Sequence, residues 1–363
     1  MRRGEFDSTA RDLQDIPEGI ISVERCRPKG QGEVLFTEQF QAITSGKGRM
    51  TAYSLFSGIE ASFNIFGAPE IKFRHSAASS VLVVYYCHSG RVGWNMRGGT
   101  AVYLGAGDLT AHSMTCCADS TMMFPLGYSE GISVSVDLER LRVSCPEILS
   151  SAGVQADRLQ QRFCSGQPSA IPACPDLEHI FAPLFSVPPA ARLPMLKLKV
   201  QELLIYLNAL EPAHKQLTQY FSRQTELIKE IHQELTGHLE QRFTIEELSR
   251  RYLINTSTLK EVFKAVYGLP IATYMKEYRI HQAMKLLRKP MILLPTLPPG
   301  WDTRPRASSP GRLRTSYKCC QQNTEKCSVK TFWSQTDGTA AEYRPCFDTV
   351  ASKSCQRTTS NKE

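Results

Sequence analysis

Residues 242–289 read RFTIEELSRRYLINTSTLKEVFKAVYGLPIATYMKEYRIHQAMKLLRK, and their apolar side chains recur every three to four positions. That period is typical of amphipathic α-helices. Thr244 precedes the first turn and Glu247 lies three residues further on, which matches a capping box at a helix N-terminus. One face of this short helix carries Ile245, Leu248 and Tyr252.

A second helix is predicted directly after the short break at 253–255. Asn255 can cap this helix through its side chain, and Gly268 followed by Pro270 ends it. Its apolar face is formed by Leu259, Val262, Phe263 and Val266. Two short amphipathic helices joined by a brief turn indicate a helix-turn-helix. A small helical bundle has the same period, so periodicity alone leaves both interpretations open.

The order of residues in this stretch resembles that of the AraC/XylS-type transcription regulators. The matching positions are Leu248, Asn255, Leu259, Phe263, Lys264, Tyr267, Gly268, Pro270, Tyr274, Arg279, Ala283, Leu286 and Leu287. Ser249 stands where the family usually has alanine. The resemblance implies a DNA-binding domain of two helix-turn-helix units, joined by a long helix that here runs from about Ile271 to Arg288.

The same resemblance implies which side chains meet DNA. Ser257, Lys260 and Glu261 match the positions that face base edges, where lysine can donate to guanine and glutamate can accept from cytosine. Phosphate contacts are expected from Arg250, Arg251, Thr256 and Lys264. For each of these residues, a solvated surface position is the competing interpretation.

Residues 20–140 have a β pattern. The segments GIEASFNIF (58–66) and GISVSVDLERL (131–141) alternate apolar and polar residues. Between them, SSVLVVYYCHSGRVGWNMRGGTAVYLGAGDLTAHSM (79–114) contains β-rich runs separated by glycine turns, one of them at Gly105–Asp108. This series of short strands predicts a small antiparallel barrel or sandwich. It resembles the cupin-type sensory barrel found in many AraC/XylS-type regulators.

The histidines of this region argue against an enzymatic barrel. Cupin enzymes hold a metal ion with clustered histidines, whereas His75, His88 and His112 are widely spaced and no H-x-H occurs. We therefore expect no metal, no cofactor and no catalysis here. A small barrel can still hold one small-molecule effector, whose identity and binding residues the sequence leaves open.

Residues 151–222 are predicted to be helical, most clearly in MLKLKVQELLIYLNALE (195–211). The apolar residues at helical spacing are Leu196, Leu198, Val200, Leu203, Leu204, Leu207 and Leu210. This face fits either a dimer contact or packing on the chain's own barrel.

The predicted fold is thus an α+β multidomain chain with an antiparallel β-barrel first and an all-α domain later. Its parts are an N-terminal arm (1–20), a cupin-like sensor barrel (21–150), a helical dimerisation or linker region (151–222), a DNA-binding domain with the first helix-turn-helix and linking helix (223–290), and a disordered tail (291–363).

Composition agrees with a folded chain that meets an anionic partner. Hydrophobic residues make up 42% of the chain, and the net charge of +8 mildly favours nucleic acid. No signal-peptide region and no membrane-spanning apolar run is evident, so a cytoplasmic location is expected. The cysteines of the first half lack zinc-ribbon spacing and are expected to be reduced, buried or half-buried thiols.

The helical period stops at Pro290, where the resemblance predicts a second helix-turn-helix. The peptide MILLPTLPPGWDTRPRASS (291–309) can be encoded so that the same bases, read two nucleotides later, give DIAADIAAWVGYETQGKF. That peptide matches the expected second unit, roughly D-I-A-x-x-V-G-Y-x-x-Q-x-x-F. The wobble bases are chosen, but the visible peptide largely fixes the second and third bases of each hidden codon.

KCCQQNTEKCS (318–328) can likewise be encoded so that the same shift gives VLPTEYRKV followed by a stop codon. That peptide looks like the family's C-terminal ending. The segment between, PGRLRTSY (310–317), agrees less well with the shifted reading frame. We infer a frame slip near Pro290, so that 291–327 are a mistranslated second unit and 328–363 are read-through. A natural low-complexity tail is the competing interpretation. Resequencing that stretch of DNA distinguishes the two.

The predicted function is a sequence-specific DNA-binding transcriptional regulator that responds to a small-molecule effector, with DNA binding impaired by loss of the second unit. Double-stranded DNA is the expected partner, and RNA polymerase and a second copy of the chain are further candidates. The alternative is a ligand-binding cupin-like protein or enzyme without DNA-binding activity.

Overall fold

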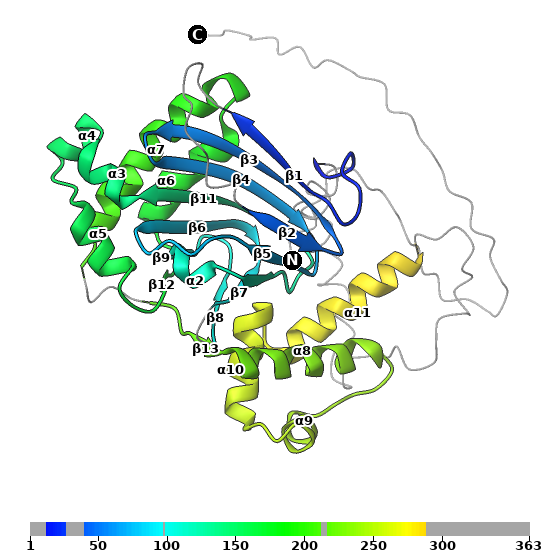
Figure 1. The fold of residues 1–363 in the computed structure, drawn as a ribbon. Coiled ribbons are helices and arrows are strands. Elements are labelled where there is room, and N and C mark those ends of the chain that lie inside the picture. Colours follow the sequence, from blue (N-terminus) through cyan, green and yellow to red (C-terminus); the bar gives the residue numbers. More distant parts are fainter. Residues whose placement is uncertain (1–11, 27–39, 97–98, 212–215, 288–363) are drawn as a thin grey trace, which may run out of the picture. The chain divides into compact units, whose positions relative to one another are not determined.

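The computed structural model describes residues 12–26, 40–96, 99–211 and 216–287, all within the contact unit Met1–Thr303. The predicted tail (291–363) and most of the predicted N-terminal arm lie outside these residues. The described chain has mixed α and β content, with most strands before residue 138 and the helices concentrated after it (Figure 1).

The strands form a seven-stranded and a six-stranded sheet. The first sheet has the order β1 (Ile21–Cys26), β3 (Lys47–Phe56), β4 (Ile59–Gly67), β11 (Ser129–Asp137), β6 (Val81–Gly90), β9 (Leu109–Ser113) and β12 (Ser169–Ile171). The second has the order β13 (Tyr220–Phe221), β8 (Thr100–Leu104), β7 (Val92–Asn95), β10 (Ser120–Met123), β5 (Glu70–Arg74) and β2 (Gln41–Thr44).

The structure departs from the predicted antiparallel β-barrel in two respects. Neither sheet closes on itself among the described strands, because no ladder joins the edge strands β1 and β12 or β13 and β2. In addition, β1 pairs with β3 in parallel.

Two predicted boundaries also shift. The alternating segment 131–141 is a strand only to Asp137, whose carboxylate accepts hydrogen bonds from the Glu139 and Arg140 amides and caps α3 (Leu138–Val143). The predicted helical region 151–222 contains the strands β12 and β13 beside its helices. Further short helices of the chain are α2 (Met114–Cys117), α4 (Glu147–Ser151) and α5 (Ala156–Phe163), of which α5 lies within the predicted helical region.

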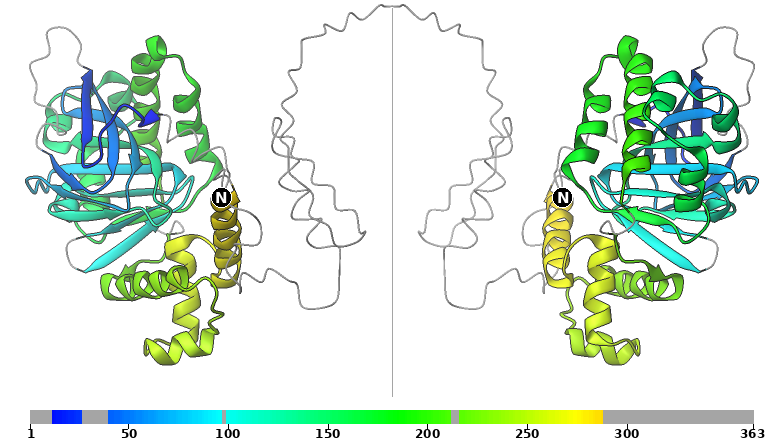
Figure 2. Two further views of the ribbon diagram at one scale, coloured as in Figure 1. Left: turned by 90° about the vertical axis from the view of Figure 1, so that its right-hand side faces the viewer. Right: turned by 90° about the vertical axis from the view of Figure 1, so that its left-hand side faces the viewer.

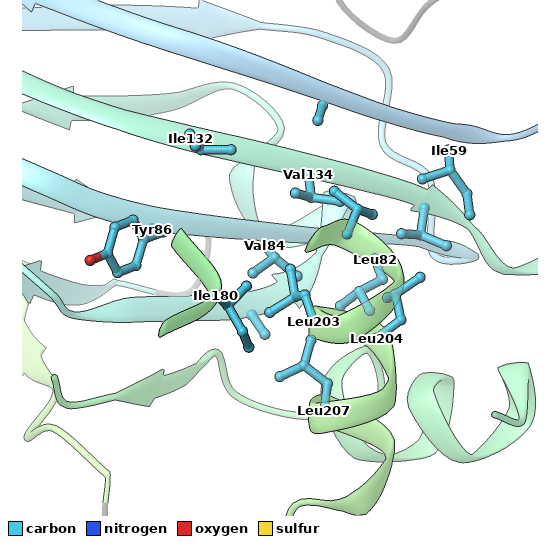
Figure 3. Close-up of a cluster of buried hydrophobic side chains, with 14 of the residues drawn as sticks. Ile59, Leu82, Val84, Tyr86, Ile132, Val134, Ile180, Leu203, Leu204 and Leu207 are labelled. Carbon is cyan, nitrogen blue, oxygen red and sulfur yellow. The ribbon is translucent and has the colours of Figure 1, made fainter. Parts of the chain in front are cut away.

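The helices α6 (Pro175–Ser186) and α7 (Pro189–Ala209) cover one face of the seven-stranded sheet. Both views in Figure 2 place this green pair against the blue and cyan strands. Figure 3 shows Leu203, Leu204 and Leu207 of α7 against Val84 and Val134 of the sheet. Burying each such side chain contributes about 1.5–3 kcal/mol. Of the two predicted roles of this helix, packing on the chain's own sheet is therefore confirmed.

Not every predicted residue of that face is buried. Leu198 is 57% exposed, because its position falls on the side of α7 that is turned away from the sheet. The seven described cysteines are free thiols, with Cys87 and Cys117 buried and the others half-buried, as the sequence predicts. Within the described ranges, no helix has the length and apolar character needed to cross a membrane.

The C-terminal described part consists of α8 (Ser222–Gly237), α9 (Ile245–Arg251), α10 (Thr256–Tyr267) and α11 (Ile271–Leu287). Their buried faces form one cluster in which α10 is central and contacts the other three helices. The predicted long helix is α11, which begins at the expected residue. Its buried contributions to the cluster are Ile271, Tyr274 and Met275.

Candidate functional site

The pair α9 and α10 begins at two side-chain caps that the sequence predicts. Thr244 Oγ1 accepts a hydrogen bond from the Glu247 amide at 3.2 Å, and Glu247 Oε2 accepts one from the Thr244 amide at 2.7 Å. Asn255 Oδ1 accepts a hydrogen bond from the Ser257 amide at 2.7 Å. These bonds satisfy amides that the first turn of a helix leaves without intrahelical partners. The starting points of both helices are therefore fixed.

The end of α10 and the turn before it depend on left-handed backbone. Gly268 caps α10 with φ 82°, a conformation that glycine adopts at no steric penalty. In the turn between the helices, Leu253 has φ 49° although it has a Cβ, and its side chain is 93% exposed. The connection between the helices is thus tight enough to force a leucine into a strained conformation.

The two faces of α10 differ sharply. Leu259, Val262, Phe263 and Val266 are all buried in the helical cluster, as predicted. On the opposite side, Ser257, Lys260, Glu261 and Lys264 are exposed. A helix fixed by one face and carrying hydroxyl, ammonium and carboxylate groups on the other can present those groups to a macromolecular surface.

Three of the predicted DNA-contacting residues already have partners within the protein. Glu261 Oε1 accepts a hydrogen bond from the Tyr220 hydroxyl at 3.4 Å. Arg251 forms an ion pair with Glu234 and lies over the Phe243 ring, 5.7 Å from its centroid. Arg250 Nε donates to the Glu246 carbonyl at 3.4 Å. Thr256 is half-buried at the start of α10.

An aromatic group around His232 supports α10 from behind. The His232 ring stacks on Tyr267 with centroids 4.2 Å apart, and its Nε2 lies 2.8 Å from the Tyr274 hydroxyl. Burial lowers the pKa of His232 to about 4. Arg279 of α11 donates to the carbonyls of Leu239 and Gln241 and so ties α11 to the loop before α9.

Arg91, between β6 and β7, reaches the other end of α10. Its Nε donates to the carbonyls of Ala265 and Val266, both at 2.9 Å, and its Nη2 also donates to Ala265. These carbonyls belong to the last turn of α10, where the helix dipole favours a cation. The partners are far apart in the sequence, so sequence reasoning could not find this contact.

The six-stranded sheet presents opposite faces to two different environments. Met123 of β10 and Tyr103 of β8 pack in the cluster of α8–α11, whereas their neighbours Met122 and Val102 pack in the core of the strand region. Alternate residues of a strand point to opposite faces. This sheet therefore forms a common wall between the strand core and the helices.

A cavity lies in the strand region, with an empty volume of about 580 Å³ that includes solvent at its opening. Its apolar lining includes Phe66, Phe73, Trp94 and Met122, and His75 lies at its margin. Five polar lining residues come from β4 and β11, namely Glu60, Ser62, Asn64, Ser133 and Ser135. Sequence reasoning missed this polar group, whose only signal is the regular spacing of polar residues along two strands.

The three histidines considered for metal binding have separate roles. His75 packs against Phe40, with ring centroids 4.8 Å apart. His88 stacks on Phe185 with centroids 3.6 Å apart. His112 is fully buried beside Trp94, and burial lowers its pKa to about 4. Throughout the part of the chain that the structure describes, no group of three or more His, Cys, Asp or Glu side chains could hold a metal ion.

No protein-family model matches the chain, and no curated protein matches it. Among solved structures, the AraC-like transcriptional activator CuxR is 15% identical, with a TM-score of 0.30 over 71% of this chain and 85% of that chain. ToxT from Vibrio cholerae is 9% identical, with a TM-score of 0.22 over 69% of this chain and 83% of that chain. A cupin protein from Bacteroides fragilis is 20% identical, with a TM-score of 0.19 over 23% of this chain and 68% of that chain. These neighbours are of the AraC-like and cupin classes that the sequence resembles, and because the TM-scores are low, function has to be inferred from the chain's own residues.

Proposed function

We propose that this chain is a sequence-specific DNA-binding transcriptional regulator of the AraC/XylS type, and not an enzyme. In this proposal α9 and α10 form a helix-turn-helix, and α10 places Ser257, Lys260 and Glu261 against base edges in the major groove. The observation that carries it is the division of α10 into a fully buried apolar face and an exposed polar face. Lys264, Thr256, Arg250 and Arg251 contact phosphates.

The strand region acts as a cupin-like sensor for a small-molecule effector held in its cavity. Met122 and Trp94 line that cavity, while Met123, the next residue of β10, packs with the helices. Arg91 follows β6, which supplies Tyr85 to the cavity, and it holds the last turn of α10. An effector that shifts β6, β7 or β10 would therefore bias the position of α10.

One hydrogen bond at this surface fits such regulation. Glu261 is engaged by the Tyr220 hydroxyl, and Tyr220 belongs to β13 at the edge of the same six-stranded sheet. Because a carboxylate accepts several hydrogen bonds, Glu261 can contact a base beside Tyr220, but this 3.4 Å hydrogen bond restrains how the carboxylate turns. Movement of β13 would release or hold the carboxylate.

DNA binding by the chain as written is impaired in this proposal, because the second helix-turn-helix is replaced after Pro290 by the frame-shifted peptide. One unit contacts one major-groove segment, whereas two units joined by a stiff helix contact two. The alternative function, a ligand-binding protein that no longer binds DNA, is favoured by the same sequence observation.

The experiment compares the chain as written with a frame-restored chain carrying DIAADIAAWVGYETQGKF after Pro290. A binding site is first selected from random duplexes with the frame-restored protein, and both proteins are then titrated on that site and on scrambled DNA at fixed salt. We expect the chain as written to lose more discrimination than total affinity. Equal discrimination by the two proteins would show that the second unit is dispensable, and absence of DNA binding by both would leave the alternative function.

Within the frame-restored protein, Lys260→Ala tests the base-reading face. Loss of a lysine–guanine contact should reduce discrimination between the selected site and scrambled DNA by about 1–3 kcal/mol. Lys264→Ala should instead weaken binding evenly on both duplexes. The control is Lys72→Ala, which removes an exposed lysine of β5 and should change neither. Equal losses on both duplexes for Lys260→Ala would make Lys260 a phosphate contact.

A further inference from the structure

The polar wall of the cavity is built by strand alternation on β4 and β11. Glu60 and Ser135 are cross-strand partners, and so are Ser62 and Ser133. Glu60, Ser62 and Ser135 are buried, with 4%, 3% and 8% of their surface exposed. Five polar side chains on one buried patch are unusual for the space between two sheets, where apolar side chains normally interdigitate.

The opposite face of the same two strands explains how the sheet stays stable. The intervening residues Ala61, Ile132, Val134 and Val136 are buried in one cluster with side chains of α6 and α7, and Figure 3 shows Ile132 and Val134 on the side of the sheet that these helices cover. Apolar packing therefore takes place on the helix-covered face, and the inner face is available for polar groups. A polar inner face between buried layers indicates a binding site rather than a requirement of the fold.

Part of this wall is fixed by hydrogen bonds within the protein. Ser62 Oγ donates to Asn64 Oδ1 at 3.0 Å, and Asn64 Nδ2 donates to Ser133 Oγ at 2.9 Å. This network holds three side chains in place at the centre of the wall. Beside it, the pair Glu60 and Ser135 offers a carboxylate and a hydroxyl, and Glu60 also interacts with another group of the protein.

The charge of the lining selects the ligand. Within the part of the chain that the structure describes, the fifteen lining residues include the Glu60 carboxylate and no lysine or arginine, and the basic member is the half-buried His75. A carboxylate in a low-dielectric wall repels anions and attracts cations more strongly than it would in water. The aromatic rings of Phe66, Phe73 and Trp94 in the lining can add cation–π attraction.

We infer that the cavity binds a compact organic amine in its ammonium form. The ammonium group donates to Glu60 and Ser135, and an apolar or aromatic body lies against Trp94, Phe73 and Met122. This inference names the effector class of the proposed regulator, so its biological role rests on the proposed function. The binding itself does not depend on DNA and can be measured with the protein alone.

The test uses three ligands of the same shape and different charge, which are benzylamine, benzyl alcohol and benzoate. Titration calorimetry and thermal unfolding of the full chain give their dissociation constants and stabilising effects. For a ligand of this size we expect benzylamine to bind with a Kd on the order of 1 mM. Benzyl alcohol should bind at least about tenfold more weakly, because it lacks the charge-assisted hydrogen bond. Benzoate should not bind.

Glu60→Gln keeps the shape of the side chain and removes its charge. It should weaken benzylamine about tenfold and leave benzyl alcohol unchanged. The matched control is Glu139→Gln at an exposed position of α3, which should change neither. If Glu60→Gln does not fold, Ser135→Ala is the second variant, and it should weaken benzylamine severalfold while the folded state is kept.

The inference is overturned if benzoate binds as tightly as benzylamine, if none of the three ligands binds, or if benzylamine affinity is the same in Glu60→Gln and the unchanged chain. Failure of the proposed function looks different. In that case benzylamine binds as expected, but the frame-restored protein shows no sequence-specific DNA binding, with or without the amine.

Discussion

Two of the buried interiors of this molecule, one among the strands beside β4 and β11 and one among the helices α8–α11, differ in composition. The space lined by β4 and β11 contains a carboxylate, an amide and several hydroxyls, whereas the interior of α8–α11 is mainly aliphatic and aromatic, with polar groups that include His232, tyrosine hydroxyls and the buried Thr225. The first arrangement places chemistry inside and can enclose a small molecule. In the second arrangement the interior packs against the apolar face of α10. The polar side chains of α10 are therefore on the surface, where they can contact a macromolecule.

The sharpest test of this difference compares one residue from each interior. Phe263→Ala removes a ring that is fully buried in the helical cluster and should lower the free energy of unfolding of that part by about 3–5 kcal/mol. Ser135→Ala removes one hydroxyl from the cavity wall and should lower it by about 1 kcal/mol or less. Denaturant unfolding measures both. Similar losses for the two variants would mean that the cavity wall is as tightly packed as the helical core.

The pH dependence tests what the two interiors share. His112 is fully buried among the strands and His232 is half-buried among the helices, and removal from solvent lowers the pKa of both to about 4. Unfolding restores the ordinary pKa near 6.5, so between these values the unfolded chain binds more protons. The stability that the two neutral histidines contribute is therefore fully present above about pH 6.5, and it is lost as the pH falls toward 4.

His232→Gln separates this effect from that of the carboxylates. The amide of glutamine can still bond to the Tyr274 hydroxyl but does not titrate, so the loss of stability with acid should become shallower. His179→Gln is the control, because the His179 side chain is 76% exposed. Denaturant midpoints at a series of pH values through the window give the slopes. An unchanged slope in His232→Gln would show that folding does not lower the pKa of this histidine, because the histidine would then bind protons equally in the folded and unfolded chain.

The sequence predicts those features that depend on residues close together in the chain. The caps at Thr244 and Asn255, the end of α10 at Gly268 and the turn at Gly105–Asp108 each involve a span of a few residues, and the structure confirms all four. The buried face of α10 follows from its period in the same way. Local hydrogen bonding and helical geometry are sufficient to specify these features.

What the sequence does not predict depends on distant partners. The parallel pairing of β1 with β3 is decided by how the sheet assembles, and the contact of Arg91 with α10 joins residues 174 positions apart. The inward direction of Glu60 depends on α6 and α7 covering the other face of β4. Alternation of polar and apolar residues reveals two faces of a strand, but which face meets solvent is a tertiary property.

Leu253→Gly gives the smallest expected effect and tests how the helical plan positions α10. Leu253 has φ 49° in the turn before α10, and its side chain is 93% exposed. A left-handed conformation destabilises a residue with a Cβ by roughly 1–2 kcal/mol, and glycine removes this strain. Glycine also gives the unfolded chain more conformational freedom, which offsets roughly 0.5–1 kcal/mol of the gain. We therefore expect a net stabilisation of up to about 1 kcal/mol in denaturant unfolding. Leu253→Ala keeps the Cβ and should give no gain, so it controls for loss of the side chain alone. A loss of stability in the glycine variant would contradict the expectation. It would mean that contacts of the Leu253 side chain stabilise the turn by more than the backbone strain destabilises it.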